Sequence, residues 1–471
     1  MERSSRALTI LGCALMSAAA LYFCLAVPWT ATATAGLAAQ PWPDGAEYLD
    51  MAVSLHRHGR ARIHVGGEEH PSRYPAAFSL VTATCLAAGA PPAAAPYRVN
   101  LLAGALLLLL MAGWVAKHQG TLEAGVAALL LATFPTFVLL SRSPLSELSA
   151  SVLVLGGAGF LYSYSGATAA QGASARGALV QGASAQGALG AALLGLSTSF
   201  RLSNVLLAPL LAAALLARKG DRWETKARQA CVLGAAMALG MLPLFFGNWI
   251  LLGHPLETGY GYWIPQWSAD QAFDLDFLRP NLAYDLRELL QQESRFTTAN
   301  LYGTGSYFGP TLVALIAWAL WTLRADRRRL WSFAAACGSY YGAMKIYFFQ
   351  DARLIFPIFL MAFPAAGRAV GLAWRGAAAS KPRAAVGSVL LIATVAGVPG
   401  SGGFSDTAAL LSVERPSSPG YRMLVQLPRM PIEAPRLILT DLNPPYVHAM
   451  TEPGTQVAPL YDDHLYRNNP K

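Results

Sequence analysis

The sequence predicts an all-α polytopic membrane protein of about eleven transmembrane helices, followed by a small extracytoplasmic α/β appendage. Of its 471 residues, 54% are hydrophobic and only 13% are charged, whereas a soluble domain carries roughly 25% charged residues. Apolar runs close to the roughly 20 residues that a helix needs to cross a bilayer recur along the chain. The net charge of +9 is therefore expected to reflect cytoplasmic Lys and Arg, and no nucleic-acid partner is predicted.

The first apolar run, MERSSRALTILGCALMSAAALYFCLAVPW, is too long for a cleaved signal peptide and predicts a retained first helix with a cytoplasmic start. The segment 76–90 predicts a short helix at the outer interface. Further spans are predicted at 97–116, 122–140, 148–164, 188–199, 205–216, 232–252, 310–323, 330–349, 354–374 and 385–399. The basic loops 217–228, 324–329 and 375–383 then all fall inside, as the positive-inside rule requires.

Two regions follow from this assignment. Residues 1–399 form the transmembrane domain, with outer loops at 41–75 and 253–308, and residues 400–471 form a small extracytoplasmic region with two β-like runs around a short helical piece. The tandem decapeptide QGASARGALV, QGASAQGALG lies within 168–190. It predicts a flexible cytoplasmic insertion, because it is rich in Gly, Ala and Ser and two such copies cannot stack a core.

Polar residues that interrupt the apolar runs are predicted to gather at the outer ends of the spans. They are Asp44, Glu47, Arg142, Glu147, Arg201, His254, Glu257, Asp351 and Arg353. Ionisable side chains at one end of several helices indicate a shared polar cavity. Snorkelling or helix capping at an interface would explain any one of them singly.

The first outer loop holds two candidate bases, in PWPDGAEYLD. Asp44 and Glu47 are three residues apart, so a helix places them on one face, where a carboxylate could accept a proton from an attacking hydroxyl or amine. The local sequence fits a capping box equally well, with Asp44 as N-cap and Glu47 at N3. Glu147, in RSPLSEL, could hold an acceptor, orient Asp44 or a metal, or simply occupy the first turn of a helix.

Arg201, Arg353 and Arg73 are candidate phosphate ligands, because a guanidinium offers a planar fork of donors and stays charged. Pairing with a nearby acid, such as Arg353 with Asp351, is the competing explanation. The segments PSRYPAAF and HPLETGYGYW combine Pro, Gly and aromatic residues, which suit sugar stacking or a membrane interface equally. The sequence contains no HExxH or Cys/His zinc spacing, no phosphate-binding P-loop and no GxSxG elbow.

Six motifs taken in order resemble the GT-C membrane glycosyltransferases. They are PDGAEYLDMA, PSRYPAAFSL, SRSPLSEL, FRLSN, GHPLETGYGYW and QDARLIFPIF. The closest likeness is to the bacterial group similar to protein O-mannosyltransferases, aminoarabinose transferases and rhizobial core-oligosaccharide transferases, and it covers most of residues 1–375. The resemblance implies a polyprenyl-phosphate-linked sugar donor, an extracytoplasmic active site and inverting transfer to a glycan, lipid or protein acceptor.

The same resemblance implies roles for particular residues. Asp44 takes the place of the base, Glu147 occupies the second acidic position, and Arg201 and Arg353 match positions near the lipid phosphate. Contacts to the sugar or lipid are expected from Tyr74, His254, Glu257, Tyr260 and Asp351.

This sequence departs from the family pattern in one place. Many members carry two adjacent acids in the first motif, whereas Gly45 follows Asp44 here, so Glu47 could share or take the role of base. Donors with a single phosphate usually need no metal in this family, so we predict neither a metal nor another cofactor. The alternative function is a transporter or flippase for a lipid-linked or small polar substrate, which matching internal halves would favour.

Overall fold

Helices dominate the computed structural model, which confirms the predicted all-α class. The structure describes residues 2–26, 43–65, 68–92, 94–141, 143–166, 176–218, 222–263, 273–283, 327–347, 352–377, 436–440 and 455–459. Five described helices are long and apolar enough to cross a membrane, and their candidate spans begin at Ala7, Ala95, Glu147, Trp223 and Arg353. The spans predicted at 310–323 and 385–399 lie outside the described residues.

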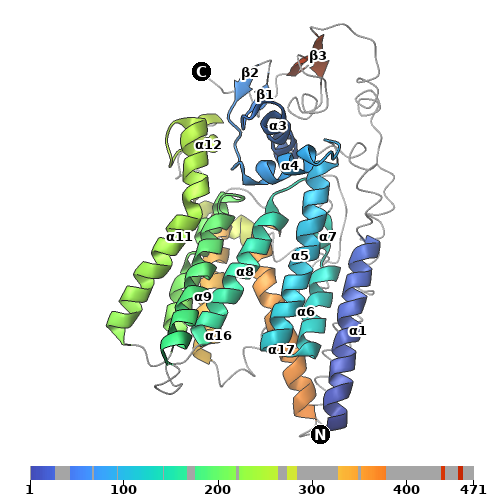
Figure 1. Cartoon of the computed structure of the whole chain (residues 1–471), viewed down its shortest axis with the longest axis vertical. Coiled ribbons are helices and arrows are strands. Elements are labelled where there is room, and N and C mark those ends of the chain that lie inside the picture. The colour runs from blue at the N-terminus through green and yellow to red at the C-terminus, as the bar shows by residue number, and fades with distance from the viewer. Residues whose placement is uncertain are drawn as a thin grey trace.

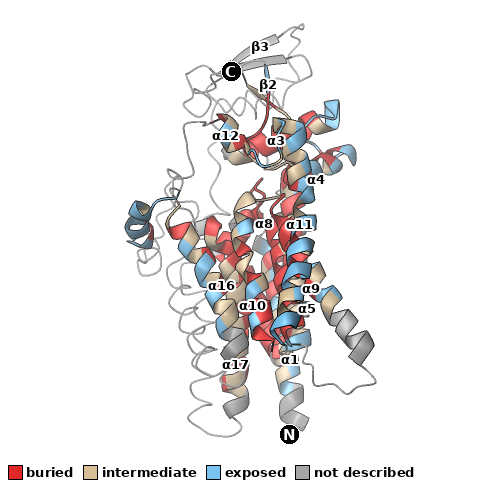
Figure 2. Cartoon of the chain, turned by 90° about the vertical axis from the view of Figure 1, so that its left-hand side faces the viewer, coloured by how far each residue is buried: buried red, intermediate tan, exposed pale blue. Residues whose placement is uncertain are grey.

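The long helices run side by side as a bundle (Figure 1). One group contains α1 (Glu2–Ala26), α5 (Ala95–His118), α6 (Thr121–Thr133) and α17 (Phe356–Ala377). A second contains α8 (Glu147–Gly166), α9 (Arg176–Ser197), α10 (Pro209–Ala217), α11 (Trp223–Leu252) and α16 (Arg327–Lys345). Helix α8 joins the groups through α5 and α17. Exposed large apolar side chains follow α11, whereas the inner helices carry most of the buried ones (Figure 2).

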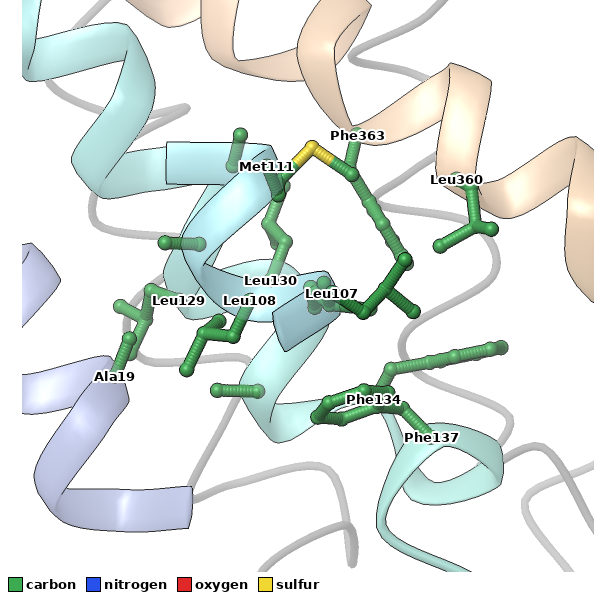
Figure 3. Close-up of a cluster of buried hydrophobic side chains, with 14 of the residues drawn as sticks. Ala19, Leu107, Leu108, Met111, Leu129, Leu130, Phe134, Phe137, Leu360 and Phe363 are labelled. Carbon is green, nitrogen blue, oxygen red and sulfur yellow. The ribbon is translucent and has the colours of Figure 1, made fainter. Parts of the chain in front are cut away.

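The first group of helices encloses a core of leucine and aromatic side chains. Leu107 and Met111 of α5 lie against Leu130 of α6 and against Phe363 of α17 (Figure 3). Phe134 adds a ring between α6 and α17, with its centroid 4.7 Å from that of Phe359. This packing fixes the position of the start of α17, which follows directly after Arg353 and the short turn η4 (Ala352–Ile355).

The span predicted at 122–140 is two helices, α6 and α7 (Pro135–Ser141). The break falls at Phe134, whose φ of −69° and ψ of 116° are extended. Pro135 explains it, because proline lacks the N–H that would continue α6 and disfavours the helical conformation in the residue before it.

The prediction of a flexible insertion is wrong for residues 176–190, which form the first part of α9. The small residues of the second decapeptide allow α9 to lie close against α8. A Cβ added at Gly190 would be 2.8 Å from the carbonyl oxygen of Gly157, and one at Gly187 would be 2.9 Å from the Tyr164 ring. Glycine serves helix contact here, which composition alone does not distinguish from flexibility; residues 168–175 lie outside the described part of the chain.

The segment predicted to be the first outer loop folds into a cap at one end of the bundle (Figure 1). It begins with α3 (Pro43–His58), continues through an antiparallel hairpin of β1 (Ile63–Val65) and β2 (Glu68–His70), and leads into α4 (Ala77–Ala87). The short helix predicted at 76–90 is therefore present as α4. Helix α12 (Gly259–Trp263) packs on this cap, where Trp263 contacts Met51 and Ile63 and donates a 2.7 Å hydrogen bond to the carbonyl oxygen of Pro71.

The C-terminal region contains the two strands expected from its β-like runs. Strands β3 (Arg436–Thr440) and β4 (Thr455–Pro459) pair in parallel, with Arg436 opposite Thr455. A parallel pair requires a connection that crosses over between the strands. The helical piece predicted within that connection lies outside the described residues.

Candidate active site

Asp44 lies in the first turn of α3, where its two carboxylate oxygens have different partners. The Tyr74 hydroxyl donates a 2.7 Å hydrogen bond to Oδ1, and Arg353 Nη1 lies 2.9 Å from Oδ2. Burial alone would raise the pKa of Asp44, but Arg353, the Tyr74 hydroxyl and Arg73 outweigh it, so the pKa falls below its usual value. Asp44 is therefore a carboxylate at neutral pH, and its side chain remains 20% exposed.

Arg353 joins Asp44 to the second acid, Glu147. The Arg353 Nη1 atom lies 3.3 Å from Glu147 Oε1, and Arg201 pairs with the same carboxylate oxygen. We call Asp44, Glu147, Arg201 and Arg353 the charged cluster. Its members come from α3, the first residue of α8, the turn after α9 and the segment before α17, so four segments far apart in sequence meet at this end of the bundle.

Glu47 lies one turn after Asp44 but is bound differently. Arg73 donates from Nε at 2.6 Å and from Nη2 to Oε1, while the Ser72 hydroxyl and the Arg73 backbone N–H donate to Oε2 at 2.9 Å and 3.1 Å. The Glu47 side chain is fully buried. Both acids thus bind other segments of the chain, not the backbone of their own helix, so the capping-box interpretation does not describe them.

Residues that the sequence analysis did not single out hold the segment 143–147 in place. Asn100 of α5 donates from Nδ2 to the carbonyl oxygens of Ser143 and Leu145. The hydroxyls of Tyr48 and Ser146 are hydrogen-bonded at 2.9 Å, which ties the start of α8 to α3. Asn100 could have been noticed, because it is a lone amide within an otherwise apolar span.

Gly45 explains the missing second acid of the first motif. A Cβ at this position would lie 2.6 Å from Pro144 Cγ, so α3 approaches the turn before α8 too closely for a side chain. A similar contact occurs at Gly259, where a Cβ would lie 1.9 Å from the carbonyl oxygen of Ser72. Glycine at both positions lets the separate segments of the cap come together around the charged cluster.

A cavity of about 800 Å³ adjoins the cluster. Three of the predicted site residues line it: Arg73, Tyr74 and Tyr260. The rings of Tyr74 and Tyr260 meet edge-on with centroids 5.8 Å apart. Because Tyr74 both lines the cavity and hydrogen-bonds to Asp44, it connects the two features directly.

Other predicted site residues are not brought to the cluster. His254 and Glu257 are exposed on the turn between α11 and α12, which follows Gly253 in its left-handed conformation (φ of +83°). Within the described ranges, no hydrogen bond or ion pair joins either side chain to the cluster. Asp351 and Arg142 lie outside those ranges, so the predicted pairing of Arg353 with Asp351 is not described, whereas its ion pairs with Asp44 and Glu147 are.

The described part of the chain shows no candidate metal site. This part contains no group of three or more His, Cys, Asp or Glu side chains positioned to hold an ion. The two acids of the cluster are each paired with arginine instead. A reaction without a metal therefore stays our prediction.

Of the three comparisons with known proteins, the search of solved structures is the one that gave matches. A scan against protein-family models found no match, and a search of curated proteins found no significant one. The oligosaccharyltransferase AglB from Archaeoglobus fulgidus, solved with an inhibitory peptide and a dolichol-phosphate, matches over 97% of this chain with a TM-score of 0.60 and 13% identity. The chain spans 65% of the length of AglB.

A second match is nearer in length. ArnT from Cupriavidus metallidurans, bound to undecaprenyl phosphate, matches over 95% of this chain and 89% of its own, with a TM-score of 0.59 and 14% identity. At such low identity the likeness is one of fold. The chain therefore has the fold of the GT-C membrane glycosyltransferases, as the resemblance of its six motifs implied.

Proposed function

We propose that this protein transfers a sugar from a polyprenyl-phosphate donor to an extracytoplasmic acceptor, with inversion at the anomeric carbon. The observation that carries this proposal is the placement of Asp44, held between Tyr74 and Arg353 beside a cavity that is partly apolar and partly basic. Two solved structures with the same fold, AglB and ArnT, contain a dolichol-phosphate and an undecaprenyl phosphate. They support a lipid-phosphate donor here.

In the proposed reaction, Asp44 accepts the proton of the acceptor hydroxyl or amine as that atom forms a bond to the anomeric carbon. The bond from this carbon to the phosphate oxygen breaks, and the polyprenyl phosphate leaves with the electron pair. Arg353 and Arg201 carry the positive charge that stabilises such a leaving group. Glu147 holds these two arginines and would orient the acceptor.

Arg353 links donor binding to the basicity of Asp44 in this scheme. A phosphate that binds its guanidinium competes with Asp44 Oδ2, which lies 2.9 Å from Nη1. Weakening this ion pair raises the pKa of Asp44, because the positive charge of Arg353 is one of the interactions that lower it. Asp44 thus becomes a stronger base when a donor is in place.

Asp44 is a better candidate for the base than Glu47. Among the described residues, the hydrogen bonds to the Glu47 carboxylate come from Arg73 and Ser72, and the Glu47 side chain has no exposed surface. Asp44 keeps 20% of its side chain exposed and contacts a residue of the cavity wall. The transporter alternative is not favoured. AglB, which shares the fold, is an oligosaccharyltransferase, and ArnT was solved with bound undecaprenyl phosphate.

Asp44→Asn provides the test. Purified protein in detergent is incubated with a mixed pool of polyprenyl-phosphate sugars and with glycan, lipid and peptide acceptors, and products are identified by mass spectrometry. We expect transfer to fall by about 10²–10⁴-fold, the usual contribution of a general base. Thermal stabilisation by the donor should persist, and the exposed Glu257→Gln variant should match wild type. A fully active, well-folded Asp44→Asn protein, or a wild type that neither transfers nor is stabilised by any donor, would contradict the proposal.

A further inference from the structure

Tyr340 of α16 is a fully buried residue that the sequence analysis did not single out. Its ring packs among apolar side chains of α10 and α16, in the core of the second group of helices. Its hydroxyl donates a 2.7 Å hydrogen bond to the carbonyl oxygen of Leu354 in η4, and it is also hydrogen-bonded to the hydroxyl of Ser203 in the turn η1 (Leu202–Leu207). One hydroxyl therefore joins two turns that lie far apart in the sequence.

Each of these turns adjoins one arginine of the charged cluster. Arg201 immediately precedes η1 and donates from Nε to the Ser203 hydroxyl oxygen at 3.2 Å, and Arg353 immediately precedes Leu354. The directions of the hydrogen bonds are fixed, because a guanidinium can only donate and a carbonyl oxygen can only accept. Ser203 thus accepts from Arg201 and donates to Tyr340, which donates to Leu354. We call this connection the arginine link.

The two turns by themselves hold their arginines weakly. Arg201 has an extended conformation between α9 and η1, with φ of −149° and ψ of 110°. The turn η4 is four residues of 3-10 helix, whose hydrogen-bond geometry is poorer than that of an α-helix. Pro357 has no N–H to offer the Leu354 carbonyl three residues before it. Contacts from α16 are therefore needed to fix both segments.

The separation of the two arginines matters because they share one carboxylate. Both pair with Oε1 of Glu147, and Arg353 also pairs with Asp44. Two guanidinium groups at one oxygen repel each other, so they stay together only where the structure holds them. The hydroxyl of Tyr340 is also within electrostatic reach of Arg201 and Glu147.

We propose that Tyr340 is a positioning residue, whose hydroxyl holds Arg201 and Arg353 at the separation that lets both pair with Glu147 and act together on the departing phosphate. The part of this inference that concerns the phosphate rests on the function proposed above. Without the hydroxyl, the two turns are no longer joined, and Arg353 moves away from Asp44.

Tyr340→Phe removes the hydroxyl and keeps the buried ring. We expect kcat for transfer to fall by about tenfold, which corresponds to the loss of about one hydrogen bond. KM for the donor should change less, because the arginines act on charge that develops as the phosphate leaves. The matched control is Tyr341→Phe, which alters the next residue of α16 and keeps the ring that Lys345 contacts. Unchanged kcat in Tyr340→Phe would overturn the inference.

Ser203→Ala breaks the arginine link at a second point. Because the two hydroxyls belong to one connection, the double variant Tyr340→Phe/Ser203→Ala should lose little more activity than Tyr340→Phe alone. A loss of about a hundredfold in the double variant, with about tenfold in each single variant, would show that the hydroxyls act independently and would overturn the link.

Asp44 reports the position of Arg353 without any transfer reaction. Arg353, Tyr74 and Arg73 lower the pKa of Asp44, so its carboxylate stabilises the fold at neutral pH, and this stabilisation is lost as the pH falls through the lowered pKa. If Arg353 moves away, the pKa of Asp44 rises and the contribution at neutral pH shrinks. Asp44→Asn should therefore change the melting temperature less in the Tyr340→Phe protein than in wild type.

The two readouts separate this inference from the proposed function. Equal effects of Asp44→Asn in both backgrounds would overturn positioning by Tyr340, whether or not the protein is a transferase. A smaller effect in the Tyr340→Phe background, in a protein without transfer activity, would support positioning by Tyr340 while the proposed function fails. Transfer by wild type with unchanged kcat in Tyr340→Phe would leave the function standing without this role for Tyr340.

Discussion

Asp44 and Glu47 lie on the same helix, one turn apart, yet their surroundings suit Asp44 to act as the base and Glu47 to form a structural ion pair. The partners of Asp44 also contact other groups, because Tyr74 lines the cavity and Arg353 pairs with Glu147. Glu47 instead pairs with Arg73 and accepts a hydrogen bond from Ser72. Removing one member of a buried ion pair leaves the other uncompensated, which is more damaging than removing both. The pair therefore orders the segment that presents Tyr74 to Asp44.

Glu47→Gln should consequently lower stability, by about 3–5 kcal/mol, because it leaves the buried Arg73 without its carboxylate. Thermal unfolding of the purified protein measures this. The double variant Glu47→Met/Arg73→Met should recover most of the loss, and the exposed Glu257→Gln should show none. Unchanged thermal stability of Glu47→Gln combined with lost transfer would instead identify Glu47 as the base.

The members of the charged cluster could be predicted from the sequence, but which of them form ion pairs with each other could not. Asp44, Glu147, Arg201 and Arg353 stand out because each interrupts or borders an apolar run. Their partners depend on which helix ends meet, and this is a property of the whole bundle.

Among the secondary-structure elements, the long apolar helices and the short helix α4 of the cap could be predicted, whereas the hairpin of the cap could not. The strands β1 and β2 have three residues each, too few for an alternating pattern to be recognised. The start of α9 was predicted about twelve residues too late, because the first half of this helix is rich in Gly, Ala and Ser. In both cases contact with a neighbour decides the structure: α12 covers the hairpin, and α8 receives the glycines of α9.

The contact between α3 and the turn before α8 gives a prediction for Gly45→Ala. The added methyl group would lie 2.6 Å from Pro144 Cγ, so one of the two segments must move. A displacement of about 1 Å at a reacting group can cost roughly 10²-fold in rate, and we expect a loss of this order in transfer. The assay is transfer by the purified variant at saturating donor.

The matched control is Gly113→Ala on α5, where a Cβ would meet no atom within 4 Å. It should keep wild-type activity and gain about 0.5–1 kcal/mol of stability, as alanine does in place of glycine within a helix. Wild-type transfer by Gly45→Ala would show that the gap between α3 and Pro144 does not position Asp44.

For the whole molecule, hydropathy and charge were enough to indicate a helical membrane fold, because the bilayer permits few other arrangements of an apolar chain. The same reasoning placed the charged cluster at one end of the bundle, and the structure brings its four members together there. Charge patterning also predicts which side of the membrane that end faces. The helix α11 provides a direct test, since its 30 residues extend about 45 Å and its two ends are both described.

We expect the end of α11 near the charged cluster to be extracytoplasmic, because Arg222, Lys226 and Arg228 lie at its other end. In a variant whose five native cysteines are replaced by alanine, His254→Cys should react with a membrane-impermeant maleimide on intact cells. Trp223→Cys, at an exposed position of the opposite end, should react only after permeabilisation. Labelling in the reverse order would place Asp44 and Glu147 in the cytoplasm, where a donor displayed on the outer leaflet could not reach them.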